Sequence, residues 1–97
     1  MRTVKSKYVV DYYENGNIFT EQYFLNGKCH KTNGPSYKRW DKNGNIDRES
    51  YYINGNMCRE SDYINGDMCK ESYFLNKEQL TKEEFKEIIS VMLRLVV

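Results

Sequence analysis

The dipeptide Asn-Gly, once replaced by Asn-Lys, recurs along the chain at nearly constant spacing. Its second residue falls at Gly16, Gly27, Gly44, Gly55, Gly66 and Lys77. The successive steps are 11, 17, 11, 11 and 11 residues, and the longer step equals 11 plus an insertion of 6. Residues 51–61 (YYINGNMCRES) and 62–72 (DYINGDMCKES) are identical at eight of eleven positions. The chain is therefore an array of 11-residue units, and its fold must accommodate that repeat.

Asn-Gly between aromatic and β-branched residues is the strongest short-range signal for a β-hairpin, because both residues of a type I′ turn need a positive φ. Removing two turn residues from each unit leaves strands of about nine residues. The expected strands lie near 5–13, 17–25, 28–31, 36–41, 45–53, 56–64 and 67–75. The insertion at 32–35 predicts an extra turn between two short strands. We predict a mainly β fold, an antiparallel up-and-down meander of 11-residue hairpin repeats.

Uninterrupted type I′ hairpins would also set the register of the sheet. Ser50 would face Arg59, and Glu49 would face Glu60 across the Asn54-Gly55 turn. Because side chains alternate between faces along a strand, one face would collect Arg48, Arg59 and Lys70 without an acid. The opposite face would collect six acids without a base, namely Asp47, Glu49, Glu60, Asp62, Asp67 and Glu71. The pattern predicts a sheet whose charges are sorted by face.

The end of the repeat array has the signature of a helix start. Thr81 and Glu84 form a capping box, with Leu80 and Phe85 placed as a hydrophobic staple. Apolar residues then recur at helical spacing, at Phe85, Ile88, Ile89, Met92 and Leu93. We expect one C-terminal amphipathic helix over 82–94 that covers the basic and aromatic face of the sheet. The whole chain, 1–97, is then a single domain, with a meander at 5–79, an insert at 28–43, and a capping helix and tail at 80–97.

The chain offers no set of residues for catalysis. With 15 basic and 14 acidic residues, its net charge is +1, which is unlike a polycation or an acidic tail. His30 is the only histidine, and no residue near it in the sequence is placed to orient it as a base. Cys58 and Cys69 occupy equivalent positions, but the meander places them about 13 Å apart, too far for a shared metal. We expect no enzyme activity, no cofactor and no metal.

The thiols and the chain ends bear on the compartment. Three widely spaced cysteines without a CxxC motif favour reduced thiols in the cytoplasm. Residues 1–10 lack the apolar stretch of a secretory signal. Residues 91–97 are too few to cross a bilayer. We expect a cytoplasmic protein without a membrane partner.

Four segments resemble the MORN-variant repeat proteins of bacteria, phages and large DNA viruses. They are YYENGN (12–17), NGKCHKTNGPS (26–36), YYINGN (51–56) and YFLNKEQLTKEEF (73–85). Lys28 and His30 with the Gly34-Pro35 pair match the family's Gly-Lys-x-His and Gly-Pro segment. The resemblance implies a repeat fold and a binding role without a reaction. It also implies an antitoxin or a phage anti-defence inhibitor, such as an anti-CRISPR inhibitor of a nuclease, working in the host cytoplasm.

The acidic face is the first candidate binding surface. Acids facing one another destabilise a sheet, and such a row either keeps an open face soluble or meets a basic partner. The candidate partner-binding residues are Glu21, Glu49, Tyr51, Glu60, Asp62, Glu71 and Tyr73. We expect a non-enzymatic module that docks this acidic, tyrosine-bearing face on a basic surface of another protein, as a small inhibitor would. The sequence leaves a homodimer open.

The insert provides an alternative. Residues 28–42 carry five basic residues against Asp41 alone, and two aromatic residues lie among them. Basic residues interleaved with aromatic ones can bind single-stranded nucleic acid through phosphate contacts and base stacking. The residues of this alternative nucleic-acid site are Lys28, Lys31, Tyr37, Lys38, Arg39 and Trp40. Nucleic acid is the less favoured partner, because five basic residues on two short strands also make an ordinary solvated edge.

Overall fold

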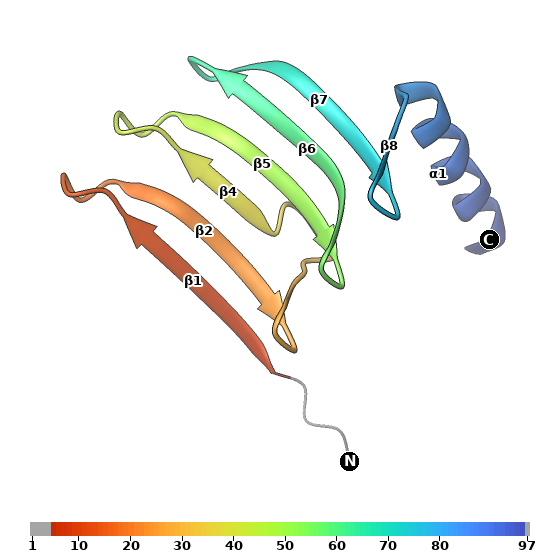
Figure 1. Cartoon of the computed structure of the whole chain (residues 1–97), viewed down its shortest axis with the longest axis horizontal. Helices are drawn as coiled ribbons and strands as arrows, with labels where there is room; N and C mark the ends of the chain where they lie inside the picture. The colour runs from red at the N-terminus through yellow and green to blue at the C-terminus, as the bar shows by residue number, and fades with distance from the viewer. Residues whose placement is uncertain (1–4, 97) are drawn as a thin grey trace.

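The computed structural model describes residues 5–96, with side chains described up to Ser90 except Ile89. The chain forms one antiparallel sheet of eight strands followed by a helix (Figure 1). The elements are β1 (Ser6–Tyr12), β2 (Ile18–Leu25), β3 (Lys28–Cys29), β4 (Tyr37–Trp40), β5 (Ile46–Ile53), β6 (Asn56–Ile64), β7 (Asp67–Leu75), β8 (Glu78–Leu80) and α1 (Lys82–Val96). Neighbouring strands follow the order β1-β2-β4-β5-β6-β7-β8, and β3 pairs with β2. The predicted meander is confirmed, and β8 is an additional short strand.

The turns are of two kinds. Positive φ angles at Asn26, Asn54, Asn65 and Asn76, and at the residue after each, define type I′ turns. These turns close four hairpins, as the Asn-Gly pattern predicts. The turns at Gly16 and Gly44 are wider, because only the glycine has a positive φ. In the Gly44 turn, the Asp41 N–H donates to Asn45 O at 2.8 Å, and the Gly44 N–H donates to Asp41 O at 3.1 Å. This is the pattern of a type I turn followed by a bulge residue.

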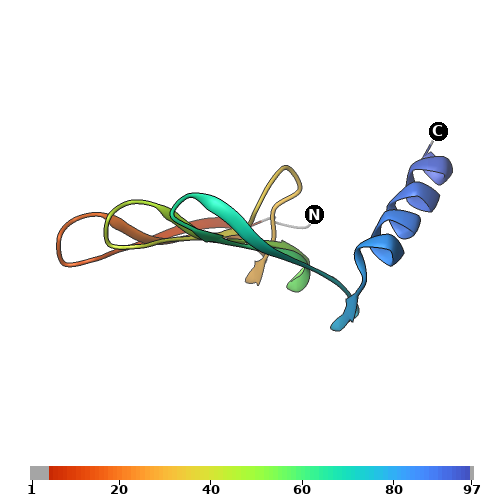
Figure 2. The same cartoon turned by 90° about the horizontal axis from the view of Figure 1, so that it is seen from above.

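The 6-residue insertion interrupts one strand rather than adding two. The N–H of Tyr23 donates to Ser36 O at 2.8 Å, and Tyr23 O accepts from the His30 N–H at 3.0 Å. On the other side, the Ser36 N–H donates to Ser50 O and the Gly55 N–H donates to Cys29 O. β3 and β4 therefore fill one position between β2 and β5, and residues 32–35 loop out of the sheet (Figure 2).

A β-bulge recurs in the hairpins and overturns the predicted register. Tyr52 pairs with Met57, but Tyr51 pairs with Arg59, so Cys58 is an extra residue in β6. The same irregularity leaves Phe19, Asp47 and Cys69 as extra residues in their strands. Each extra residue follows the second turn residue by three positions, so the bulge repeats with the sequence. The predicted pairs Ser50·Arg59 and Glu49·Glu60 are wrong.

The bulge also changes which residues share a face, because one extra residue reverses the alternation of side chains. Two faces result. The ion-pair face carries Asp11, Thr20, Tyr37, Arg39, Arg48, Ser50, Glu60, Asp62, Lys70 and Ser72. The tyrosine face carries Tyr8, Glu21, Tyr23, Lys38, Glu49, Tyr51, Arg59, Ser61, Tyr63, Glu71 and Tyr73. Both faces carry both signs of charge, so the predicted sorting of charge by face is wrong.

Helix α1 begins as predicted but does not cover the expected face. The Glu84 N–H donates to Thr81 Oγ1 at 3.1 Å, and the Thr81 N–H donates to Glu84 Oε1 at 2.9 Å, which confirms the capping box. The Phe85 ring packs on Tyr73 with centroids 4.4 Å apart. Tyr73 lies on the tyrosine face, not on the predicted basic face. The helix stands beside β7 and β8 at one end of the sheet (Figures 1 and 2).

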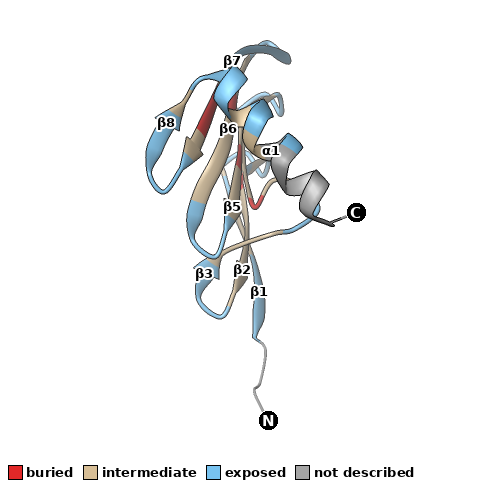
Figure 3. Ribbon diagram, turned by 90° about the vertical axis from the view of Figure 1, so that its right-hand side faces the viewer, coloured by how far each residue is buried: buried red, intermediate tan, exposed pale blue. Residues whose placement is uncertain are grey.

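The described residues include almost no apolar core. Among them Tyr73, 8% exposed, is the only buried aromatic or aliphatic side chain. The other buried residues are small and polar: Thr20, Ser36, Ser50, Ser61 and Ser72 (Figure 3). The accessible surface of 7481 Å² exceeds the roughly 5,800 Å² expected for a compact monomer of this mass. The radius of gyration of 15.4 Å likewise exceeds about 12.5 Å. The fold is a single open layer, in which α1 covers the tyrosine face at Tyr73 and the rest of both faces carries no second layer of described residues.

Candidate protein-interaction face

Ion pairs between successive repeats organise both faces. Arg48 Nε lies 2.7 Å from Asp62 Oδ1 and 3.8 Å from Glu60 Oε1, all on the ion-pair face. One repeat later, Arg59 Nε lies 3.0 Å from Glu71 Oε1 on the tyrosine face, although the angle is not that of a hydrogen bond. In both cases an arginine lies close to the glutamate 12 residues later in the sequence. The Arg48–Glu60 pair is on the ion-pair face, and the Arg59–Glu71 pair is on the tyrosine face.

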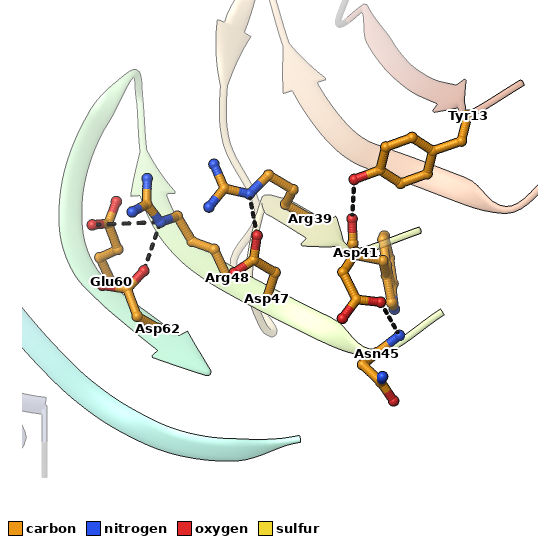
Figure 4. A network of polar contacts seen from close by, with 9 residues as sticks. Tyr13, Arg39, Asp41, Asn45, Asp47, Arg48, Glu60 and Asp62 are labelled. Carbon is orange, nitrogen blue, oxygen red and sulfur yellow. Dashed lines mark hydrogen bonds and ion pairs between the residues drawn. The ribbon is translucent and has the colours of Figure 1, made fainter. Parts of the chain in front are cut away.

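On the ion-pair face, two arginines and Asp11 are engaged by side chains of the same sheet. Arg39 Nε donates to Asp47 Oδ2 at 2.8 Å beside the Arg48 cluster (Figure 4). On the same face, between β1 and β2, Thr20 Oγ1 donates to Asp11 Oδ2 at 3.1 Å. The pKa of the Arg48 guanidinium is raised, chiefly because it donates to Asp62. These contacts engage Arg39 with Asp47 and Arg48 with Asp62 within the sheet.

On the tyrosine face, carboxylates hold tyrosine hydroxyls in place. Tyr8 Oη donates to Glu21 Oε2 at 2.7 Å, and Tyr63 Oη donates to Glu49 Oε1 at 2.6 Å. Donation to a carboxylate stabilises the protonated phenol, which raises the pKa of Tyr8 and of Tyr63 to about 12. The hydrogen bonds tie each of the two rings to a carboxylate of the neighbouring strand.

Cations and rings hold the remaining tyrosines of this face. The Arg59 guanidinium lies 4.2 Å from the Tyr51 ring centroid, and its Nη2 donates to Tyr51 Oη at 3.0 Å. Lys31 Nζ lies 4.1 Å from the Tyr23 centroid. The Tyr8 and Tyr23 rings pack at 4.8 Å. Such cation–π contacts restrict the side chains while leaving part of each ring accessible.

The structure brings together five of the seven predicted partner-binding residues. Glu21, Glu49, Tyr51, Glu71 and Tyr73 share the tyrosine face.

The other two predicted residues, Glu60 and Asp62, lie on the ion-pair face against Arg48. The expected placement of Glu60 and Asp62 with the other acids is wrong, because the bulge at Cys58 turns them to the other side. The face is also not purely acidic, since Lys38 lies opposite Glu21 on one neighbouring strand and opposite Glu49 on the other.

Four functional candidates on this face were not identified from the sequence: Tyr8, Tyr23, Arg59 and Tyr63. The spacing of 12 residues that Arg48–Glu60 shares with Arg59–Glu71 is a signal that could have identified Arg59. Tyr8 and Tyr23 depend on the pairing of β1 with β2, which only the register of the first hairpin decides.

The residues of the alternative nucleic-acid site do not share one surface. Tyr37 and Arg39 lie on the ion-pair face, whereas Lys38 and Trp40, which alternate with them along β4, lie on the opposite, tyrosine face. Arg39 is paired with Asp47, and Lys31 is engaged by Tyr23. Lys28 is exposed beside the Asn54-Gly55 turn.

The potential metal and nucleophile residues have structural surroundings. His30 Nδ1 accepts the Asn54 N–H at 3.0 Å, which ties the insert to the β5–β6 turn. Cys29, Cys58 and Cys69 are free thiols, and burial raises the pKa of the Cys58 thiol. Over residues 5–96, no cluster of three His, Cys, Asp or Glu side chains could hold a metal ion.

Among the described residues, no helix is long and apolar enough to span a membrane.

Comparisons of the chain with protein-family models, with curated proteins and with solved structures gave no match.

Proposed function

We propose that the chain is a non-enzymatic interaction module that docks its tyrosine face on another protein and covers part of that protein's surface. The observation that carries the proposal is the single-layer sheet, whose tyrosine face is covered by α1 only at Tyr73 among the described side chains and is ordered by contacts within the face itself. Tyr8, Tyr51 and Tyr63 each have a hydroxyl bonded to a charged neighbour. Rings held before binding lose little conformational entropy on contact.

The composition of the face supports protein rather than a small ligand as the occupant. Tyrosine and arginine are the residues enriched at energetically important positions of protein interfaces. Glu21, Lys38 and Glu49 alternate in sign across adjacent strands. A complementary partner therefore has mixed charge rather than a uniformly basic surface. Covering a functional surface of that partner would make the chain an inhibitor or antitoxin.

Site-specific photo-crosslinking distinguishes the two faces. Tyr51→p-benzoylphenylalanine places the probe on the tyrosine face, and Tyr37→p-benzoylphenylalanine is the matched control on the ion-pair face of the adjacent strand. We expect the first variant, and not the second, to form a crosslink to a protein in host lysate. An excess of the chain without the probe should compete with this crosslink and reduce it. Crosslinking from position 37 alone would contradict the assignment of the face.

A second assay addresses the alternative partner. A fluorescent single-stranded oligonucleotide is titrated with the chain and with a Lys28→Glu, Lys31→Glu variant. We expect no salt-sensitive binding by either protein. Binding that the double substitution abolishes would move the function to the insert.

A further inference from the structure

The outer side of β1 is the longest open strand edge in the described sheet. β1 spans seven residues and pairs only with β2 among the described residues. An unpaired edge presents a row of main-chain donors and acceptors that another strand can use. The opposite edge, β8, has three residues and is followed at once by α1.

The hydrogen bonds at the two ends of β1 show which main-chain groups point outward. Lys5 N–H donates to Asn26 Oδ1 at 3.0 Å, and Lys5 O accepts the Asn26 N–H at 2.7 Å. At the other end, Tyr13 N–H and O both bond within the β1–β2 turn, to Asn17 and Gly16. Main-chain groups alternate in direction along a strand, and β1 itself has no bulge.

The odd-numbered residues of β1 therefore bond toward β2. The outward groups belong to the even-numbered residues Ser6, Tyr8, Val10 and Tyr12.

An antiparallel copy of β1 fits this edge with its own outward groups. With a twofold axis at Val9, Tyr8 pairs with Val10 of the second copy, and Ser6 pairs with Tyr12 of the second copy. All outward groups are then used, in about eight main-chain hydrogen bonds. Val9 faces Val9 of the second copy at the axis.

The side chains are complementary in the same register. Lys7 faces Asp11 of the second copy, and the axis makes this ion pair twice. Both side chains are exposed and lie on the ion-pair face. A shift of two residues, the smallest that keeps the outward groups paired, places Lys7 opposite Val9 or Tyr13 instead.

We infer that two copies of the chain associate through β1, forming one continuous sheet across a twofold axis. The interface is narrow, because it consists of one strand from each copy. It is therefore reversible and depends on protein concentration. It leaves both tyrosine faces uncovered, so it is compatible with the proposed binding function and does not require it.

Charge reversal tests the register directly. Lys7→Asp places like charges opposite each other twice, and Asp11→Lys does the same with cations. Each variant should associate about tenfold or more weakly than the wild type in sedimentation equilibrium, because two attractive pairs become repulsive. Mixing the two variants restores opposite charges at both positions, so the mixture should form a heterodimer. Equal association of all four samples would overturn the inference, as would a wild type that stays monomeric up to about 1 mM.

Hydrogen exchange on the wild type provides a readout that needs no substitution. The amides of Tyr8 and Val10 should exchange fast in dilute protein and become protected as concentration rises. The Val9 amide, which points toward β2, should be protected at every concentration. Concentration-dependent protection elsewhere, with Tyr8 and Val10 unchanged, would place the contact on another surface and contradict the inference.

Discussion

The two edges of the sheet end in different ways. At the C-terminal edge, the short strand β8 leads into α1, and Phe85 packs on the only buried aromatic or aliphatic side chain among the described residues, Tyr73. At the N-terminal edge, β1 has exposed residues over most of its length, and Tyr12 is 62% exposed. The buried aromatic contact thus lies at one edge, and open hydrogen-bonding capacity at the other.

The difference shows how a single-layer sheet can be stable without a central core. Its centre is held by strand pairing, repeated ion pairs and buried serines rather than by apolar packing. An aromatic contact is needed where the sheet stops, because the last long strand has no further repeat to pack against. At β1 the ring of Tyr8 packs on Tyr23 but remains 51% exposed, and the outer side of the strand pairs with no other described strand.

The largest expected effect is at the closed edge. Tyr73→Ala should lower the free energy of unfolding by about 3 kcal/mol, since it removes a buried ring and leaves Phe85 without its contact. The matched control is Tyr12→Ala at the open edge, which should change stability by less than about 0.5 kcal/mol because Tyr12 is mostly exposed. Urea unfolding followed by circular dichroism measures both. Equal losses would remove the distinction between the edges.

A smaller effect is expected at the start of α1. Thr81→Ala should cost about 1 kcal/mol, because the Glu84 N–H loses the side-chain oxygen that caps the helix. Helical ellipticity should fall, while strand signals and the amide protection of β5 and β6 should persist. A Lys82→Ala variant serves as control, since Lys82 does not take part in the capping box. Loss of the strand signals would mean that the helix supports the whole sheet.

The cap also predicts a dependence on pH. The pKa of Glu84 is lowered, chiefly by its hydrogen bond from the Thr81 main chain. A lowered folded-state pKa contributes stability above the usual glutamate range, and this contribution is lost as pH falls through the folded-state value. Acid should therefore unwind the first turn of α1 in the wild type more than in Glu84→Gln, as followed by ellipticity between about pH 5 and pH 2. Identical acid profiles would contradict the role of this carboxylate.

The smallest effect concerns Tyr8 on the open edge. Its pKa is raised to about 12 by donation to Glu21, so Glu21→Gln should return the Tyr8 titration toward pH 10. A raised folded-state pKa contributes stability that is present below pH 10 and lost as pH rises toward 12.

Tyrosinate absorbance, compared between Glu21→Gln and Glu21→Gln with Tyr8→Phe, isolates the Tyr8 transition. Glu14→Gln is the control for a loss of charge in the same hairpin. A Tyr8 transition that stays near pH 12 without Glu21 would show that the carboxylate is not its cause.

Local chemistry made much of the fold predictable. Asn54-Gly55 specifies a type I′ turn within two residues, and Thr81 with Glu84 specifies a helix start within four. Strand positions follow from the turns, because each strand must fill the space between them. The predicted strands therefore agree with β1 to β7, whereas β8 was missed, since only three residues, Glu78–Leu80, separate the Asn76-Lys77 turn from the helix cap at Thr81.

The candidate site was less predictable than the fold. Tyr51 and Tyr73 were expected on one face with Glu49 and Glu71, and they lie there together. Glu60 was expected beside them and lies on the other face with Arg48. Two bulge residues account for this error, because an extra residue turns every later side chain of its strand to the opposite face. Cys58 separates Glu60 from Glu49, and Cys69 returns Glu71 to the face of Glu49.

The sequence by itself determined the repeat length, the turns, the strand order and the helix cap, because each depends on residues a few positions apart. Only the tertiary structure decided which faces the side chains share. The bulge at Cys58 forms only when two strands pair, and it increases the local twist of the sheet. With the bulge in place, Arg48 lies against Asp62, and Arg59 lies against Glu71. The tyrosine face and the open edge of β1 exist for the same reason: pairing between strands, not local propensity, decides what a sheet exposes.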